Sequence, residues 1–573
     1  MPKAEGEILS KTPAAGVPGA GWLALAFVAV GLAVYAPSFE GQFLSDDLHY
    51  VRHNEYIHTP SFENLVDIWN PTSEVAELVE NYAPVHLSLH SLEWQFFGPE
   101  VTGYHVVNVL LHAWAALLLA LLFRRSGIAG WSSAMGAAVF LLHPANVESV
   151  AWISQLKSSS ALVLSLGAIL LHPKRPAFAL VLFALALLAK PFSASALVVV
   201  ALFGWLRGGS TSEAGAPAFF GPRAVWLLGW VAVVVAFAIA EILAFSRSAG
   251  LAPPLYADLG IRGLMIFSVA LRYGMIAVSG TGVSTFHEPA AATSLADPFF
   301  LGGAFLLALL CWRLIVCLRA RREEAVYWIW AAVGFAPLSG IVPLPYPMAD
   351  RYLYFILPGL IGGVLLAGQQ WLPTVEARLG TGKGIRRLRA GLLAAAFGLC
   401  SALAFMSHDR ASVFYSPESL MADAERNYPD GAAASTRKAS RAARRGDTRA
   451  ALAHLRSARA RGYNRVDHLL QDPAYASMQG DPEFAEIKNE MAQDWILRLG
   501  ELPAPGHYKA RALAQAYVAV DELDQAVAVL EAAADRPGPI ADALREDAET
   551  LAAELRFRAR VEARRSGPKR TLP

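Results

Sequence analysis

"GWLALAFVAVGLAVYAP" (residues 21–37) and "AVWLLGWVAVVVAFAIAEILAF" (residues 224–245) decide the fold class of this chain. Buried helices of soluble proteins rarely stay apolar for this long, whereas about 20 apolar residues are needed to cross a bilayer as a helix. Comparable runs fill most of residues 21–406, in a chain of 573 residues that is 55% hydrophobic and 17% charged. The sequence therefore predicts an all-α, polytopic helical membrane protein.

The apolar runs predict eleven membrane spans, and the basic residues between them predict the orientation. The spans are residues 21–37, 104–123, 130–143, 148–172, 176–190, 192–207, 223–246, 297–318, 325–342, 351–373 and 389–406. Basic clusters lie at Arg124/Arg125, Lys174/Arg175, Arg207 to Arg223, Arg319/Arg321/Arg322 and Lys383/Arg386/Arg387/Arg389. All five clusters fall on the cytoplasmic side if residues 257–280 form an interfacial or re-entrant segment, as the positive-inside rule favours.

This topology divides the chain into a cytoplasmic tail (1–20), a membrane domain (21–408) and an external C-terminal part. The first long loop, 38–103, is then external, and it carries Arg52 as its single Lys or Arg beside eleven acidic residues. The first apolar segment lacks a small-residue cleavage site, which favours an uncleaved helix over a signal peptide. The net charge of +1 gives no indication of nucleic-acid binding, and three cysteines in apolar runs offer no disulfide or zinc framework.

The composition changes after residue 406 to polar, Ala-rich sequence with a helical period. "RGDTRAALAHLRSARA" (residues 445–460) and "YKARALAQAYVAVDELDQAVAVLEAAAD" (residues 508–535) both match the packing pattern of tetratricopeptide helix pairs. Residues 409–565 are therefore expected to form a tetratricopeptide-like helical domain on the external side, followed by a flexible tail at 566–573. A generic array of amphipathic helical hairpins is the alternative.

Unusual polar residues collect at the ends of the predicted helices that face outward. The patches are Asp46, Asp47 and His49 in "SDDLHY"; His143, Asn146, Glu148, Gln155 and Lys157 in "FLLHPANVESVAWISQLK"; Lys190 in "LLAKPF"; His287 and Glu288 in "STFHEP"; and Asp350 and Arg351 in "PLPYPMADRYLY". A cation at a helix end often only reaches for the lipid headgroups. Because five patches share one side, we expect a polar site at the external membrane surface.

Carboxylates beside cations at a lipid surface suit a substrate with a phosphate head and a hydrocarbon tail. Lys190 and Arg351 could neutralise a phosphate leaving group, and an Asp could accept the proton of an attacking hydroxyl. The chain has no Gly-rich phosphate loop and no HExxH or GxSxG motif. His86 and His90 lie four residues apart, as a metal pair or as part of an interfacial amphipathic helix.

At these residues the chain resembles the GT-C-fold protein O-mannosyltransferases, and more closely the transmembrane and tetratricopeptide-repeat members and their bacterial relatives. "SDDLHY" resembles the acidic motif of their first external loop. "NYAPVHLSLHSLEWQFFGPEVTGYHVVNVLLHAWAALLL" (residues 81–119), "LHPANVESVAWIS", "LALLAKPF" and "MADRYLYFILPG" resemble further family segments in the same order. With the C-terminal repeats, the resemblance covers nearly the whole chain.

The resemblance implies a GT-C helical bundle whose active site lies under the first external loop. The donor would be a polyprenyl-phosphate-linked sugar such as mannose, and the acceptor a hydroxyl, expected on Ser or Thr of exported proteins that the repeats could recruit. Asp46 would be the general base, Asp47 would orient the acceptor or join Asp46 in holding a divalent cation, and Lys190 and Arg351 would bind the lipid phosphate. His49, His143, Glu148, His287, Glu288 and Asp350 would line the substrate site. The implied location is a bacterial inner membrane with the C-terminal domain in the periplasm.

Two departures from the family pattern leave alternatives open. Ala83 stands in "NYAP" where the family has an Arg, and "SQLKSSSA" (residues 154–161) replaces a more charged segment. The sugar could instead be transferred to lipid or surface polysaccharide, or the chain could be a catalytically inactive membrane-anchored repeat scaffold. A transporter is a further option, although no inverted halves are evident.

Overall fold

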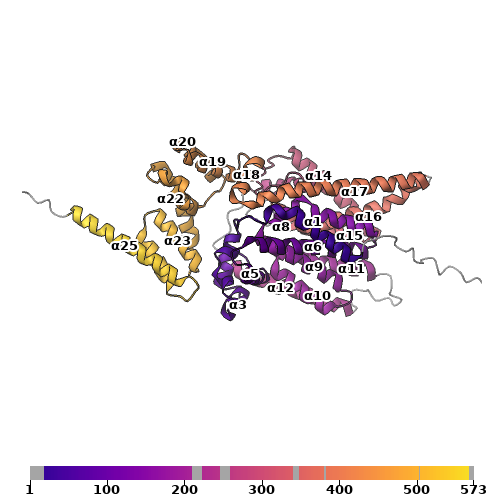
Figure 1. Cartoon of the computed structure of the whole chain (residues 1–573), viewed down its shortest axis with the longest axis horizontal. Coiled ribbons are helices and arrows are strands. Elements are labelled where there is room, and N and C mark those ends of the chain that lie inside the picture. Colours follow the sequence, from indigo (N-terminus) through magenta and orange to yellow (C-terminus); the bar gives the residue numbers. More distant parts are fainter. Residues whose placement is uncertain are drawn as a thin grey trace, which may run out of the picture.

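The computed structural model describes residues 19–208, 222–245, 258–339, 348–379, 382–502 and 504–566, and every regular element within these ranges is a helix. Figure 1 shows a large helical bundle joined at one end to a smaller helical domain. Apart from Gly19, Ala20 and Ser566, the predicted tails lie outside the described residues.

Eight helices in the described part of the chain are long and apolar enough to cross a membrane. They are α1 (Ala20–Tyr35), α6 (Val101–Arg125), α9 (Leu156–Leu171), α12 (Pro222–Phe245), α13 (Leu259–Ser279), α14 (Pro298–Arg319), α16 (Leu353–Leu379) and α17 (Gly382–Ala411). Three shorter apolar helices accompany them: α7 (Gly130–Leu142), α10 (Pro176–Ala189) and α11 (Ser195–Gly208). The chain is therefore an integral membrane protein.

The structure departs from the predicted spans at α13 and α15. Residues 257–280 were expected to be interfacial or re-entrant, yet α13 is one 21-residue apolar helix with the length and composition of a span. The predicted span 325–342 contains α15 (Glu324–Phe335), which has only 12 residues and continues as a 3-10 turn, Ala336–Ser339. Pro337 lies in that turn and cannot donate a helical hydrogen bond. The count of eleven spans thus stays a prediction.

Helices α15 and α16 pack closely because a glycine lies at their contact. A Cβ atom on Gly359 of α16 would lie 2.6 Å from the Ala331 nitrogen and 2.6 Å from the Tyr327 carbonyl oxygen. Small residues let helix backbones approach in this way inside membranes. Pro358, the residue directly before Gly359, also lies inside α16.

Several basic clusters gather at the end of the bundle remote from loop 38–103. Arg207 pairs with Glu323 and also donates to the Arg125 carbonyl oxygen. Arg322 donates to Gln370 of α16, and Gln369, also in α16, donates to the Gly127 carbonyl oxygen. We call this region the basic end. Its assignment to the cytoplasm stays a prediction, since no membrane is present in the structure.

The opposite end carries loop 38–103 and the C-terminal helical domain. The loop folds into α2 (Glu55–His58), α3 (Phe62–Trp69), α4 (Glu74–Val79) and α5 (Pro84–Phe97). The domain contains α18 (Pro417–Asn427), α19 (Ala432–Arg444), α20 (Thr448–Ala460), α21 (Val466–Gln471), α22 (Pro482–Gly500), α23 (His507–Ala519), α24 (Leu523–Ala534) and α25 (Ala541–Ser566). Ala451 and Leu455 of α20 and Ala526 and Leu530 of α24, which lie in the two segments that match the tetratricopeptide packing pattern, are buried. The tetratricopeptide assignment itself stays a prediction.

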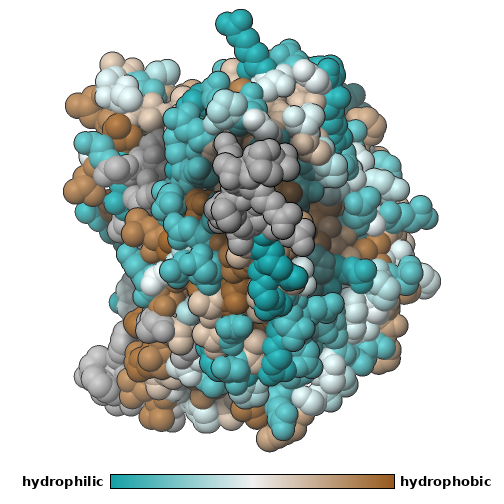
Figure 2. Space-filling model, turned by 90° about the vertical axis from the view of Figure 1, so that its left-hand side faces the viewer, coloured by the Kyte–Doolittle hydropathy of each residue, from teal (hydrophilic) through white to brown (hydrophobic). Residues whose placement is uncertain are grey.

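The helical domain docks on loop 38–103 through acidic residues of α4 and its C-terminal end. Glu77 accepts from the Gly506 backbone N–H at 2.7 Å, and His507 Nδ1 contacts Glu74. Lys509 pairs with Glu80. Figure 2 looks onto this end of the molecule, where hydrophilic residues cover much of the surface between scattered hydrophobic patches.

Candidate functional site

The site is built where the helical path between α7 and α9 is broken. Pro144 opens a 3-10 turn, Pro144–Asn146, followed by the short α8 (Val147–Ala151) and a second 3-10 turn, Ile153–Gln155. Trp152 between them is extended, with φ −89° and ψ 122°. This break leaves the Ser154 N–H without a partner inside a helix, and it donates instead to Asp47 of loop 38–103 at 2.7 Å.

The two adjacent acids of "SDDLHY" have different environments. Asp47 is buried, and its carboxylate accepts from the Leu44 N–H at 2.8 Å and from the Ser154 N–H at 2.7 Å. Burial raises the pKa of the Asp47 carboxyl to about 8, although these two hydrogen bonds lower it. Asp46 is half-buried, and the only hydrogen bond of its carboxylate within the described ranges is a long one, 3.4 Å, from Ser45 Oγ. Asp47 therefore holds the loop, and Asp46 keeps its carboxylate available.

Ser45, directly before the acids, has a left-handed backbone with φ +47°. A non-glycine residue adopts this conformation at an energetic cost and does so mainly where the surroundings enforce it. Here the Asp47 N–H donates to the Leu44 carbonyl, and Trp152 Nε1 donates to the same oxygen at 3.1 Å. The strained turn sets the direction of Asp46 relative to the α8–α9 break.

Two cationic side chains act on Asp46, and a third, Lys190, acts on those two. Asp46 interacts electrostatically with both Lys157 and Arg351, and Lys190 interacts with the same two cations. Lys190 is 8% exposed and donates to Ser158 Oγ at 2.6 Å and to Gln155 Oε1 at 3.3 Å. No described carboxylate forms an ion pair with Lys190. Lys190 thus lacks a carboxylate partner among the described residues, and an anionic ligand would supply its counter-charge.

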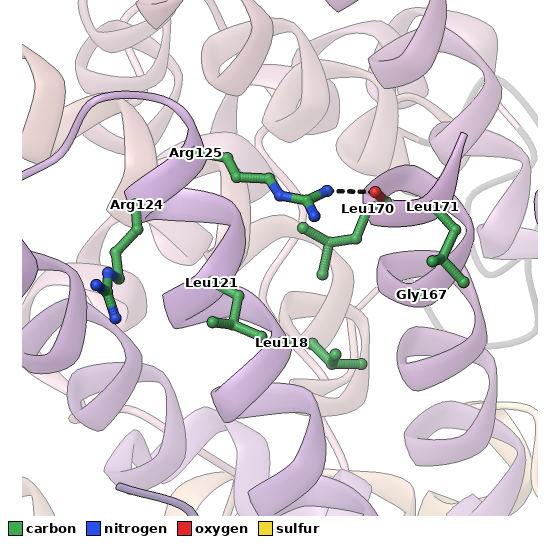
Figure 3. Close-up of a pocket in the computed structure, with 7 residues that line it drawn as sticks. All are labelled: Leu118, Leu121, Arg124, Arg125, Gly167, Leu170 and Leu171. Carbon is green, nitrogen blue, oxygen red and sulfur yellow. Dashed lines mark hydrogen bonds between the residues drawn. The ribbon is translucent and has the colours of Figure 1, made fainter. Parts of the chain in front are cut away.

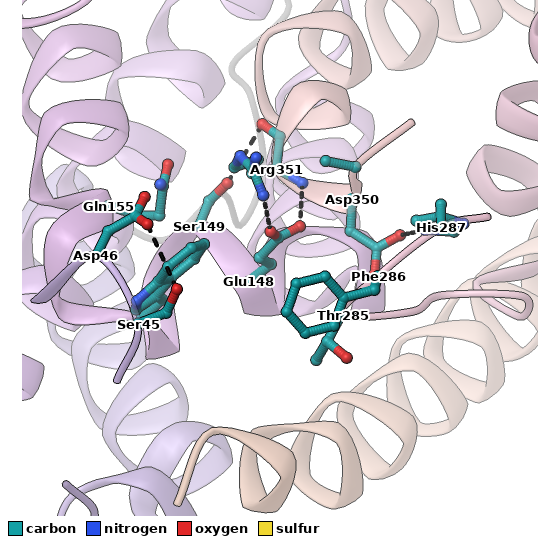
Figure 4. A network of polar contacts seen from close by, with 12 residues as sticks. Ser45, Asp46, Glu148, Ser149, Gln155, Thr285, Phe286, His287, Asp350 and Arg351 are labelled. Atoms are coloured by element: carbon teal, nitrogen blue, oxygen red, sulfur yellow. Dashed lines mark hydrogen bonds and ion pairs between the residues drawn. The ribbon is translucent and has the colours of Figure 1, made fainter. Parts of the chain in front are cut away.

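Arg351 is oriented by Glu148. The buried Glu148 carboxylate accepts from the Arg351 backbone N–H at 2.7 Å and also pairs with its guanidinium. In Figure 4 this pair lies between Asp46 and the Asp350–His287 pair. Because Glu148 takes up part of the guanidinium charge, it fixes the position of Arg351 and leaves its remaining N–H groups for a ligand.

His287 and Asp350 form a second, structural group. His287 Nε2 lies 2.7 Å from Asp350 Oδ1, and both side chains are 1% exposed. Arg410 lies 3.6 Å from the other Asp350 oxygen and 2.6 Å from Asp423 of α18. These contacts join the membrane bundle to the helical domain, so neither His287 nor Asp350 faces the Asp46 cluster freely.

The remaining predicted site residues also have their own partners. Both ring nitrogens of His143 are engaged, with the Ala145 N–H at 3.2 Å and the Ala277 carbonyl at 3.2 Å. Glu288 accepts from the first N–H groups of α19 and so caps that helix. His49 is exposed and interacts electrostatically with Arg465 of the helical domain. The structure thus brings together Asp46, Glu148, Lys190 and Arg351 from the predicted set, with Asp47 holding the loop beside them.

A divalent cation at Asp46 and Asp47 has little support from the donor groups present. Both carboxylate oxygens of Asp47 already accept backbone hydrogen bonds. Among the described residues, no group of three or more His, Cys, Asp or Glu side chains could hold a metal ion. His86 and His90 do lie together, with ring centroids 4.4 Å apart, but His90 Nδ1 is taken by Glu93 at 2.7 Å.

Lys157 and Tyr50 are the members of the site that the sequence prediction ranked too low. Lys157 Nζ donates to the Tyr50 hydroxyl at 3.2 Å and lies 4.3 Å from the centre of its ring. Lys157 was noted in the sequence, and its place as the single Lys or Arg of residues 140–157 is the signal that could have selected it. Tyr50 carried no such signal, because its role depends on how loop 38–103 folds.

Comparison with protein-family models finds no match. The chain is similar to Protein O-mannosyl-transferase TMTC4 of Homo sapiens, 26% identical over 151 residues, which is 23% of this chain and 20% of that protein. It is also similar to Protein O-mannosyl-transferase F38B6.6 of Caenorhabditis elegans, 25% identical over 156 residues, or 26% of this chain and 23% of that one. The similarity thus spans only about a fifth of the length of these curated relatives.

This similarity is distant and partial, and it is of the same kind as the resemblance drawn from the sequence motifs.

Proposed function

We propose that this chain transfers a sugar, with mannose as the first candidate, from a polyprenyl-phosphate donor to a hydroxyl, on Ser or Thr of exported proteins. The observation that carries the proposal is the cluster around Asp46. It combines an available carboxylate with Lys157, Lys190 and Arg351 at the end of a membrane bundle. The GT-C architecture and the recruiting role of the repeat domain are part of the same proposal.

In the proposed reaction, the acceptor oxygen attacks the anomeric carbon of the donor sugar. The bond from that carbon to the phosphate oxygen breaks, polyprenyl phosphate leaves, and the hydroxyl proton passes to Asp46. Removing this proton before attack is unfavourable, because an alcohol is far less acidic than a carboxylic acid. Asp46 would act as charge develops, while Lys190, Lys157 and Arg351 stabilise the leaving phosphate.

Replacement of Asp46 by Asn tests the proposal. The variant keeps the size of the side chain but cannot accept the proton, and we expect transfer to fall by about 100-fold or more. The assay is mass spectrometry of exported proteins from cells that carry the wild type, Asp46→Asn or no copy of the chain. Glu40→Gln, at an exposed acid of the same loop, is the matched control.

Each outcome selects one function. Hexose on Ser or Thr that is lost in Asp46→Asn and kept in Glu40→Gln supports the proposal. Loss of sugar from lipid or polysaccharide alone would move the acceptor to those molecules. Unchanged glycosylation with normal membrane insertion would contradict catalysis and favour a scaffold.

A further inference from the structure

A hollow of about 480 Å³ opens between α6 and α9 near the basic end, far along both helices from the Asp46 cluster. Its floor is apolar, with Gly167 of α9 and four leucines: Leu118, Leu121, Leu170 and Leu171. Arg124 and Arg125, the last residues of α6, line the same hollow. Figure 3 shows the arginines at one end, with Leu121 and Leu118 following along α6. We call this hollow the α6–α9 groove.

The two arginines have different roles at the groove. Arg125 donates to the Leu170 carbonyl oxygen and so bridges α6 and α9. Arg124 is exposed, and within the described ranges no acidic side chain pairs with it. The turn after α9 adds Lys174 and Arg175, both exposed. Two arginines therefore line the groove, and two more cations follow three and four residues after Leu171, which also lines it.

No acid in the neighbouring sequence offsets these cations. Residues 101–125 and 156–190 contain neither Asp nor Glu. Glu323 is connected to this region through Arg207, which donates to the Arg125 carbonyl oxygen, and it is paired with that arginine. The positive charge is thus free to attract a ligand, and the leucines beside it exclude a purely polar one.

We propose that the α6–α9 groove binds one anionic phospholipid from the leaflet at the basic end. Its acyl chain would lie against the four leucines, and its phosphate would meet Arg124, Lys174 and Arg175. Basic pockets between membrane helices select lipids by headgroup charge, because a zwitterionic lipid carries its own ammonium group. A second copy of this chain does not fit, since two basic ends repel each other. The proposal is independent of the sugar-transfer reaction.

Native mass spectrometry of the purified full chain tests this site. Phosphatidylglycerol and phosphatidylcholine with identical acyl chains are added separately to the wild type, Arg124→Gln and Arg387→Gln. We expect the wild type to hold one phosphatidylglycerol at least about 10-fold more tightly than phosphatidylcholine. Loss of one cation at a membrane surface lowers affinity by about 5-fold, so Arg124→Gln should show that drop. Arg387→Gln, at an exposed basic residue outside the groove, should not.

A groove-filling variant, Leu121→Trp, separates a lipid from a free phosphate. It should reduce binding of phosphatidylglycerol while leaving every arginine in place, and glycerol phosphate should not displace the lipid. Equal binding of the two lipids by the wild type would overturn the proposal. An equal loss of binding in Arg387→Gln would also overturn it, because that would indicate general attraction to the basic end. Competition by glycerol phosphate would overturn it as well, because that would indicate a polar phosphate site.

Discussion

Asp46 and Asp47 are neighbours in the chain, but backbone hydrogen bonds distinguish their chemistry. The N–H groups of Leu44 and Ser154 both point at Asp47, so this carboxylate ties the loop to the start of α9. Asp46 receives no backbone hydrogen bond of this kind in the described structure. A mutation at either acid would reduce activity for a different reason, and stability measurements can tell the two apart.

Replacing Asp47 by Asn should destabilise the protein by about 1–3 kcal/mol. The amide has one oxygen acceptor, so one of the two backbone N–H groups would face the NH2 group and lose its hydrogen bond. The measurement is the thermal unfolding midpoint in detergent. Asp46→Asn is the matched control and should unfold within about 0.5 kcal/mol of the wild type. An Asp47→Asn protein as stable as the control would contradict the structural role.

Replacing Lys190 by Met should reduce sugar transfer by about 100-fold or more with little loss of folded protein. Lys190 donates to Ser158 and Gln155 and has no described carboxylate as a partner, so in the proposed reaction the leaving phosphate would be the counter-ion of its ammonium group. The measurement is the rate of transfer with membrane insertion monitored in parallel. Lys383→Met, at an exposed lysine of α17, should be unaffected. A full rate in Lys190→Met would remove this residue from the site.

At the scale of elements, the contact of α15 and α16 depends on the absence of a side chain at Gly359. Gly359→Ala should destabilise the protein by about 1–3 kcal/mol, because the new Cβ would lie 2.6 Å from two backbone atoms of α15. Gly368→Ala on the same helix meets nothing within 4 Å and should be neutral or slightly stabilising. Thermal unfolding measures both, and equal midpoints would show that the helices separate easily at this point.

The sequence predicted most helices because long apolar runs are a direct signature of membrane spans. It did not predict where helices break. The extended Trp152 and the short α15 are set by packing and by turn residues, and the apolar content of those segments does not report them. For the same reason the sequence indicated the external polar patches but not which of their residues lie together at the Asp46 cluster and which have structural partners elsewhere. His143, His287, Glu288 and Asp350 carry the residue types of a site, yet their partners lie more than 60 residues away in many cases.

At the scale of the whole molecule, acid should loosen the loop that covers the site. Burial, helped by His90, Lys157 and Lys190, lowers the pKa of His86 well below its ordinary value. The folded protein therefore keeps His86 neutral while an unfolded chain binds a proton below about pH 6.5. The contribution of His86 to stability is full above that pH and falls by about 1.4 kcal/mol for each pH unit below it.

The comparison of wild type with His86→Phe isolates this effect. The raised pKa of Asp47 has the opposite effect on stability between about pH 4 and 8. The folded state holds a proton there that the unfolded state releases, so this contribution to stability grows as the pH falls. That contribution is common to both proteins and cancels in the difference. As the pH falls from 7.5 to 5, the unfolding midpoint of the wild type should therefore fall relative to that of His86→Phe. The two midpoints should approach each other, or His86→Phe should become the more stable protein. Parallel curves would contradict a neutral buried His86.

The docking of α23 on α4 has a consequence for how the chain matures. Glu74 and Glu77 meet Gly506 and His507, partners separated by 429 to 433 positions. A ribosome that adds about 5–20 residues per second needs roughly 20–90 s to make that intervening stretch. During this interval loop 38–103 exists without these contacts. A chain that stops before α23 would leave the loop that carries Asp46 without this support, so synthesis of residues 506 and 507 is needed before the loop can take its final arrangement.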